Sequence, residues 1–131
     1  MDDQAWYKNS FDGCPLTFAL NLIGGKWRLP IIWALNKNRT MRYNELKRSI
    51  DGITNMMLTQ SLKELELYGI IRREQFPEVP PRVEYSLTEH GEELMAALKA
   101  LAGWGKKMKT VVIQNNIELE PAAGIPDSSD S

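Results

Sequence analysis

Cysteine and histidine are nearly absent: the 131 residues include one of each. A single cysteine excludes an internal disulfide framework and a four-thiolate zinc site, and a single histidine excludes a histidine-rich metal site. No apolar run reaches the roughly 18 residues of a membrane-spanning helix. Residues 1–11 are polar and acidic, unlike the basic and then apolar start of a secretory signal. We therefore expect a cytoplasmic protein whose thiol is kept reduced.

The composition is that of an ordinary globular domain, with 43% hydrophobic and 25% charged residues. The net charge of −1 conceals an uneven distribution. Residues 26–82 hold eleven basic and six acidic side chains, whereas residues 1–13 and 110–131 are acidic. A basic middle region is compatible with binding to nucleic acid, although such stretches are also common on solvated surfaces.

Hydrophobic periodicity and capping residues divide the chain into elements. Pro15 and the Gly24-Gly25 pair delimit a first helix, and Thr54 and Thr88 are typical N-caps of later helices. The pattern predicts helices over 15–23, 26–36, 43–50 and 54–68, a loop over 36–40, strands over 70–76 and 82–87, and a long helix over 88–109. We expect an arm or short helix over 1–13, a folded domain over 14–109, and an acidic, flexible tail over 110–131.

A short helix, a glycine turn and a longer helix followed at once by a hairpin make the winged helix-turn-helix order. Residues 14–104 also contain the segments IGGKW (23–27), YNEL (43–46), GIT (52–54), LTQ (58–60), LKELE (62–66), GII (69–71) and PEVPPRVEYSLT (77–88), closed by Gly91. These segments resemble the HxlR-type winged-helix regulators of bacteria, relatives of the MarR group. The resemblance implies a mainly helical, homodimeric DNA-binding transcriptional regulator with a β-hairpin wing. It also implies dimer contacts from the N-terminal segment and the long C-terminal helix.

The second helix of a helix-turn-helix meets the base edges of DNA with its first residues. If the leucines at 58, 62 and 65 face the core, the residues facing outward are Thr54, Asn55, Met56, Thr59, Gln60 and Lys63. Amide side chains suit adenine, threonine and methionine suit a thymine methyl group, and lysine suits phosphate. Many members of the resembled family carry a basic residue where this chain has Met56 and Ser61.

Arginines outside the second helix are further candidates for contact with DNA. Arg42 precedes the short helix, and Arg72, Arg73 and Arg82 lie on the hairpin. We expect Arg42 to clamp the DNA backbone, with a screened surface charge as the alternative. For Arg72 and Arg82 on the hairpin we expect contact with phosphates or entry into a minor groove. The alternative is a solvated strand edge protected by charge.

Cys14 stands just before Pro15, near the N-cap of the first helix. The positive end of that helix favours a thiolate there. The resemblance implies redox sensing, because some members sense oxidants or electrophiles through a cysteine at this position; a buried, inert thiol is the alternative. With no second cysteine, a disulfide would have to join two chains or a small thiol.

The row of apolar side chains along the last helix is longer than the core of one small domain needs. We therefore expect a dimer interface that includes Trp6, Leu98, Leu101, Trp104 and Met108. An extended core within one chain is the alternative.

The leading functional hypothesis is a dimeric regulator that binds a pseudo-palindromic duplex operator and responds to Cys14 chemistry or to a small-molecule or electrophile inducer. The second is a winged-helix module that binds protein partners. A thiol enzyme is disfavoured, because His90 is the only histidine, lies far from Cys14 in the sequence and belongs to no catalytic motif. No metal, cofactor or membrane partner is expected.

Overall fold

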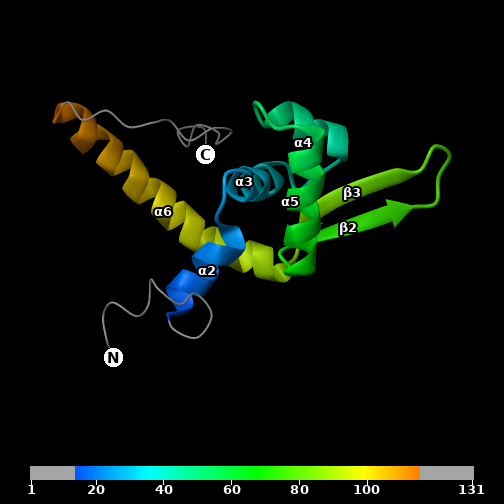
Figure 1. The fold of residues 1–131 in the computed structure, drawn as a ribbon, viewed down its shortest axis with the longest axis horizontal. Coiled ribbons are helices and arrows are strands. Elements are labelled where there is room, and N and C mark those ends of the chain that lie inside the picture. The colour runs from blue at the N-terminus through cyan, green and yellow to red at the C-terminus, as the bar shows by residue number, and fades with distance from the viewer. Residues whose placement is uncertain (1–13, 116–131) are drawn as a thin grey trace.

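The computed structural model describes residues 14–115 (Figure 1). The expectations for residues 1–13, including Trp6, and for residues 116–131 lie outside this part of the chain. In chain order the elements are α2 (Pro15–Ile23), α3 (Arg28–Asn38), β1 (Thr40–Met41), α4 (Tyr43–Ser49), α5 (Asn55–Leu67), β2 (Ile71–Phe76), β3 (Arg82–Leu87) and α6 (Glu89–Gln114).

Two of the predicted capping residues fix where helices begin. The Thr54 hydroxyl accepts a hydrogen bond from the Met57 N–H at 3.1 Å, and α5 starts at the next residue. The Thr88 hydroxyl does the same for Gly91 at the start of α6, at 3.2 Å. Such bonds satisfy N–H groups that the first turn of a helix leaves unpaired.

The sheet has three antiparallel strands in the order β1-β3-β2, one more than the predicted hairpin. The expected loop over 36–40 was wrong: α3 continues to Asn38, and Thr40 and Met41 pair with β3. A strand of two residues is too short for alternation to reveal it. Met41 is buried opposite Tyr85, so β1 closes one side of the core. The whole arrangement is a winged helix-turn-helix, as predicted.

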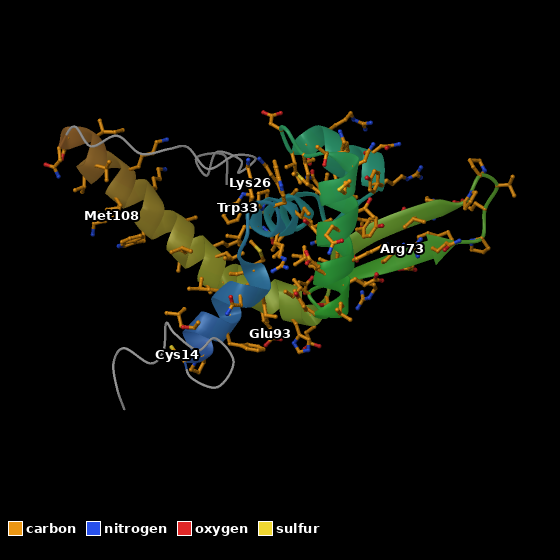
Figure 2. The ribbon with its side chains drawn as sticks, viewed as in Figure 1. Cys14, Lys26, Trp33, Arg73, Glu93 and Met108 are labelled. Carbon is orange, nitrogen blue, oxygen red and sulfur yellow. The ribbon has the colours of Figure 1, made fainter. Side chains whose placement is uncertain are left out.

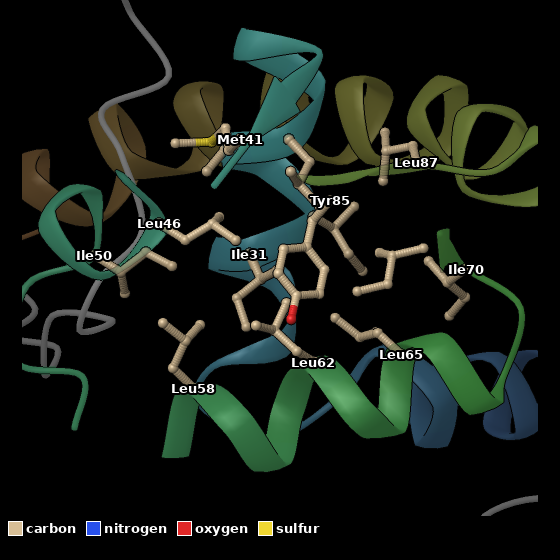
Figure 3. Packing of buried hydrophobic residues seen from close by; sticks show 14 of the residues in the cluster. Ile31, Met41, Leu46, Ile50, Leu58, Leu62, Leu65, Ile70, Tyr85 and Leu87 are labelled. Carbon is tan, nitrogen blue, oxygen red and sulfur yellow. The ribbon is translucent and has the colours of Figure 1, made fainter. Parts of the chain in front are cut away.

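The core lies where α3, α4, α5 and the sheet converge (Figure 3). Ile31 from α3, Leu46 from α4 and both Leu58 and Leu65 from α5 are almost completely buried. Burial of each such side chain is worth about 1.5–3 kcal/mol. The core therefore holds α5 in one rotation about its axis, with its remaining face turned outward.

α6 has two parts with different surroundings. Its first turns pack on the body and bury Gly91, Met95 and Leu98. The helix then extends away from the body (Figure 1) and ends at Gln114, five residues past the boundary expected at residue 109. Three consecutive β-branched residues, at 111–113, continue the helix although their intrinsic helix propensity is modest.

Candidate nucleic-acid interface

α5 presents a buried face and a polar, exposed face. All six residues predicted to face outward are exposed: Thr54, Asn55, Met56, Thr59, Gln60 and Lys63. The side chain of Met56 is 81% exposed, whereas Ser61 is only 7% exposed. The departure from the family pattern at Ser61 therefore lies inside the fold, and only the one at Met56 lies on the outer face.

Tyr43 ties the short helix α4 to the start of α5. Its hydroxyl oxygen lies 3.0 Å from the Asn55 carbonyl oxygen, 3.2 Å from Asn55 Oδ1 and 3.2 Å from Thr59 Oγ1. These contacts orient two of the candidate base-reading side chains. The sequence analysis gave Tyr43 no role beyond the start of the short helix. The signal it missed was the phenol hydroxyl in the first turn of α4.

The strand register separates the two neighbouring arginines of the wing. Arg73 is opposite Tyr85, which faces the core, and Arg72 is opposite Ser86 on the reverse face of the sheet. A depression of about 310 Å³ is lined by Arg73, Lys63 and Thr59, among others. The structure thus brings Arg73 (Figure 2), which the predicted set left out, close to the exposed face of α5. It does not bring the predicted Arg72 there.

Arg82 is engaged within the wing. Its Nε atom lies 3.3 Å from Glu78 Oε2 and 3.2 Å from Glu84 Oε2, and its guanidinium lies 4.2 Å from the centroid of the Phe76 ring. Direct contact between Arg82 and DNA would compete with these interactions. These contacts stiffen the wing, and the DNA contact predicted for Arg82 stays a prediction.

Arg42 occupies the N-cap of α4 and is exposed. Its backbone N–H donates a hydrogen bond to Glu45 Oε1 at 2.8 Å, which anchors the start of the helix. The guanidinium remains at the surface of the helix-turn-helix unit, where sequence analysis placed it.

Arg28 connects α2 with α5. Its guanidinium donates a hydrogen bond to the Asn21 carbonyl oxygen at 2.8 Å and lies 3.1 Å from Glu64 Oε2. The ion pair is partly shielded from solvent, because the Arg28 side chain is only 17% exposed. One side chain therefore links α2 to α5.

Cys14 is the N-cap residue of α2, as predicted, and is half-buried. Its backbone carbonyl accepts the first hydrogen bond of the helix, from the Phe18 N–H at 3.1 Å. Figure 2 places it at the outer end of α2, away from the wing.

Apolar side chains remain exposed on α2 and α6. Leu101 and Trp104 of α6 are 53% and 61% exposed, and Leu16, Phe18 and Leu20 of α2 are exposed too. Leu98 was wrongly placed in the interface: it is 5% exposed and belongs to the core of its own chain. Met108, on the outer part of α6 (Figure 2), is half-buried.

Within residues 14–115, no group of three or more His, Cys, Asp and Glu side chains is placed to hold a metal ion. His90 is exposed, and its Nδ1 atom lies 3.2 Å from Glu93 Oε1. None of the helices described is both long and apolar enough to cross a membrane.

Comparisons with known proteins agree with this geometry. The sequence model of the HxlR-like helix-turn-helix family matches residues 22–112. An HTH-type transcriptional regulator of Methanothermobacter thermautotrophicus is 50% identical over 93 residues, which are 71% of this chain and 70% of that protein. The redox regulator HypR in its reduced form has a TM-score of 0.72 at 40% identity, over 77% of this chain and 99% of that one. The transcriptional regulator YodB from B. subtilis, in its reduced form, has a TM-score of 0.66 at 35% identity, over 72% of this chain and 93% of that one. The chain belongs to the HxlR-like helix-turn-helix family of transcriptional regulators.

Proposed function

We propose that this protein binds a pseudo-palindromic DNA duplex as a homodimer, with the start of α5 in the major groove and the wing along the adjacent backbone. The observation that carries the proposal is the exposed polar face of α5, which the core holds outward and Tyr43 orients. On that face Asn55 and Gln60 are suited to adenine, and Met56 and Thr59 to a thymine methyl group. Lys63 is suited to phosphate.

The exposed apolar side chains of α2 and α6 support the dimer. An exposed tryptophan beside an exposed leucine is costly in water and typical of the centre of an interface. A twofold axis through α6 would place a second recognition helix on the partner protomer. The two helices of such dimers contact DNA half-sites about 34–36 Å apart, which is one turn of duplex.

Arg73→Ala is expected to weaken duplex binding about tenfold and to reduce the slope of log K against log salt by about one unit for each phosphate that the side chain neutralises. The reason is that Arg73 lies beside Lys63 on the same face as α5. Fluorescence anisotropy with a labelled duplex at several salt concentrations measures both quantities.

Arg72→Ala is the matched control, since it removes the same charge from the next residue on the opposite face of the sheet. It should leave the affinity and the salt slope within about twofold of the original protein. Equal losses of affinity for both variants would contradict the assignment of the DNA-contacting face.

We further propose that oxidation or alkylation of Cys14 weakens DNA binding. Two related structures belong to a redox regulator, HypR, and to diamide-treated YodB. In this chain Cys14 begins α2, and Arg28 joins the end of α2 to Glu64 of α5. Movement of α2 would therefore reach the recognition helix.

Diamide is expected to lower duplex affinity at least about fivefold in the original protein and to leave Cys14→Ser unchanged. Diamide removes two electrons and two protons from two thiols and is itself reduced to the hydrazine. The disulfide joins either two Cys14 residues of a dimer or Cys14 and an added small thiol. Anisotropy with non-reducing gel electrophoresis measures the effect, and an equal loss of affinity in Cys14→Ser would refute the role of this thiol.

A further inference from the structure

A second hollow lies on the side of the sheet that faces away from α5. It has a volume of about 810 Å³ and is bounded by the end of α3, β1, the reverse face of the wing strands and the first turns of α6. Pockets for small molecules in proteins commonly measure about 300–1,000 Å³. The wall comes from both parts of the molecule, the winged-helix body and the long helix.

The chemistry of this hollow, which we call the rear groove, is cationic and apolar at once. Arg39, Arg72 and Lys99 line it, and Glu92 is its single acidic residue. Leu87 and Met95, both buried, contribute apolar surface. The combination matches a ligand with an anionic group and a hydrocarbon or aromatic body.

The three cations have no ion-pair partner within the part of the chain that the structure describes: no carboxylate there lies within 4.0 Å of any of them. Like charges gathered at one groove repel each other, and a bound anion relieves that repulsion. Two other arginines of the fold are paired, Arg28 with Glu64 and Arg82 with two glutamates. The rear groove therefore gathers three cations, unpaired within the described residues, around one acidic residue.

The backbone at Arg39 is strained. Its φ of +62° and ψ of −61° are the angles of a classic γ-turn, which residues with a side chain rarely adopt. Such strain persists only where the surrounding structure imposes it, and it clusters at ligand-binding positions. Here it holds a guanidinium-bearing residue at the rim of the groove, between the end of α3 and β1.

We propose that the rear groove binds a small organic anion, a carboxylate or phosphate monoester with an apolar body, and that this ligand regulates the protein. Arg39 and Arg72 hold the anionic group, for which the planar guanidinium fork is well suited. Lys99 adds a third positive charge from α6, and the apolar body lies against Leu87 and Met95.

The regulatory step follows from the position of the groove and rests on the proposed DNA-binding function. A ligand held by Arg39, Arg72 and Lys99 links the sheet and α3 to α6. With the dimer contacts on α6, as proposed above, this link fixes the orientation of each winged-helix body relative to the twofold axis. That orientation determines the distance between the two recognition helices. Ligand binding itself requires neither DNA nor a dimer.

Binding is tested on the full chain without DNA, by NMR titration and calorimetry with 4-phenylbutyrate and phenyl phosphate. Both are expected to bind saturably, with shifts at Arg39, Arg72 and Lys99. The neutral 4-phenylbutanamide should bind at least tenfold more weakly, as should inorganic phosphate, which has no apolar body. Arg72→Ala should weaken the binding of both organic anions at least tenfold. Arg73→Ala, which changes the neighbouring residue on the other face of the sheet, should leave their binding unchanged.

Three results would overturn the rear groove as a ligand site: no saturable shift with either probe, equal binding of the neutral analogue, or equal binding of inorganic phosphate, which would mean an adventitious ion only. Regulation is tested separately, with a probe at saturation. It should change the duplex affinity at least threefold in the original protein and not in Arg72→Ala. Unchanged affinity with intact probe binding would overturn only the regulatory step, and absence of duplex binding without any probe would overturn the proposed function instead.

Discussion

Replacing Gly91 with alanine is expected to lower the free energy of unfolding by about 2–4 kcal/mol, because overpacking a rigid site costs about 1–3 kcal/mol and more where backbone blocks it. A β-carbon at this position would overlap the backbone carbonyl oxygen of Ile70 and press on Leu87. Neither the carbonyl nor the start of α6 can move freely, since the Thr88 hydroxyl binds both the Gly91 N–H and the Ile70 carbonyl oxygen. Denaturant unfolding measures the loss of stability.

Gly103→Ala is the matched control in the same helix. A β-carbon there would have no atom within 4 Å, and Gly103 lies on the side of α6 that carries Lys99 and Lys107. This change should raise stability by about 0.5–1 kcal/mol, the usual gain for alanine over glycine in a helix. A destabilisation below about 1 kcal/mol for Gly91→Ala would mean that the start of α6 does not lie as close to the Ile70 carbonyl as described.

Trp104→Glu is expected to weaken dimerisation by about 30-fold to 1,000-fold, the range for removal of a hot-spot side chain worth about 2–4 kcal/mol. The indole is 61% exposed in the single chain and stands one turn from Leu101, which is also exposed. A carboxylate in the middle of such an apolar surface also carries a desolvation cost. Duplex affinity should fall in parallel, because one protomer offers only one recognition helix to a paired site.

Leu67→Glu is the control for this substitution. Leu67, at the end of α5, is even more exposed, at 82%, and lies outside the surface formed by α2 and α6. Sedimentation velocity over a range of concentrations should show a dimer for Leu67→Glu and a monomer for Trp104→Glu. A dimer in both cases would place the interface elsewhere.

The helices and the exposed face of α5 follow from local signals in the sequence. Thr54 and Thr88 cap their helices with their own hydroxyls, and leucines at helical spacing decide which face of α5 is buried. These interactions lie within a few residues of one another. A single sequence therefore contains enough information to predict them.

The wing was predicted less well, because its faces depend on pairing between strands. Ile70 and Ile71 are both apolar, so alternation did not decide which of the following arginines faces the core. The pairing of Ile71 with Leu87 decides it, and places Arg73 rather than Arg72 beside α5. Arg82 likewise depends on how the hairpin tip brings Glu78 to it.

Leu98 shows the corresponding limit for α6. The apolar stripe continues from Leu94 through Leu98 to Leu101 without interruption, although the body of the same chain covers Leu98 and leaves Leu101 exposed. Where the body ends along a helix depends on tertiary packing, and the periodicity of the helix itself contains no sign of it.

The central claim, sequence-specific duplex binding by a dimer that uses α5 and Arg73, is tested most directly by selection from a pool of random duplexes. Binding to the selected duplex is then measured at about 50 and 200 mM salt. We expect two related half-sites about 10 base pairs apart and a fall in affinity of about a hundredfold, as four phosphate contacts predict. No enrichment, or an affinity that changes less than about twofold with salt, would contradict the claim and favour a winged-helix module for protein partners.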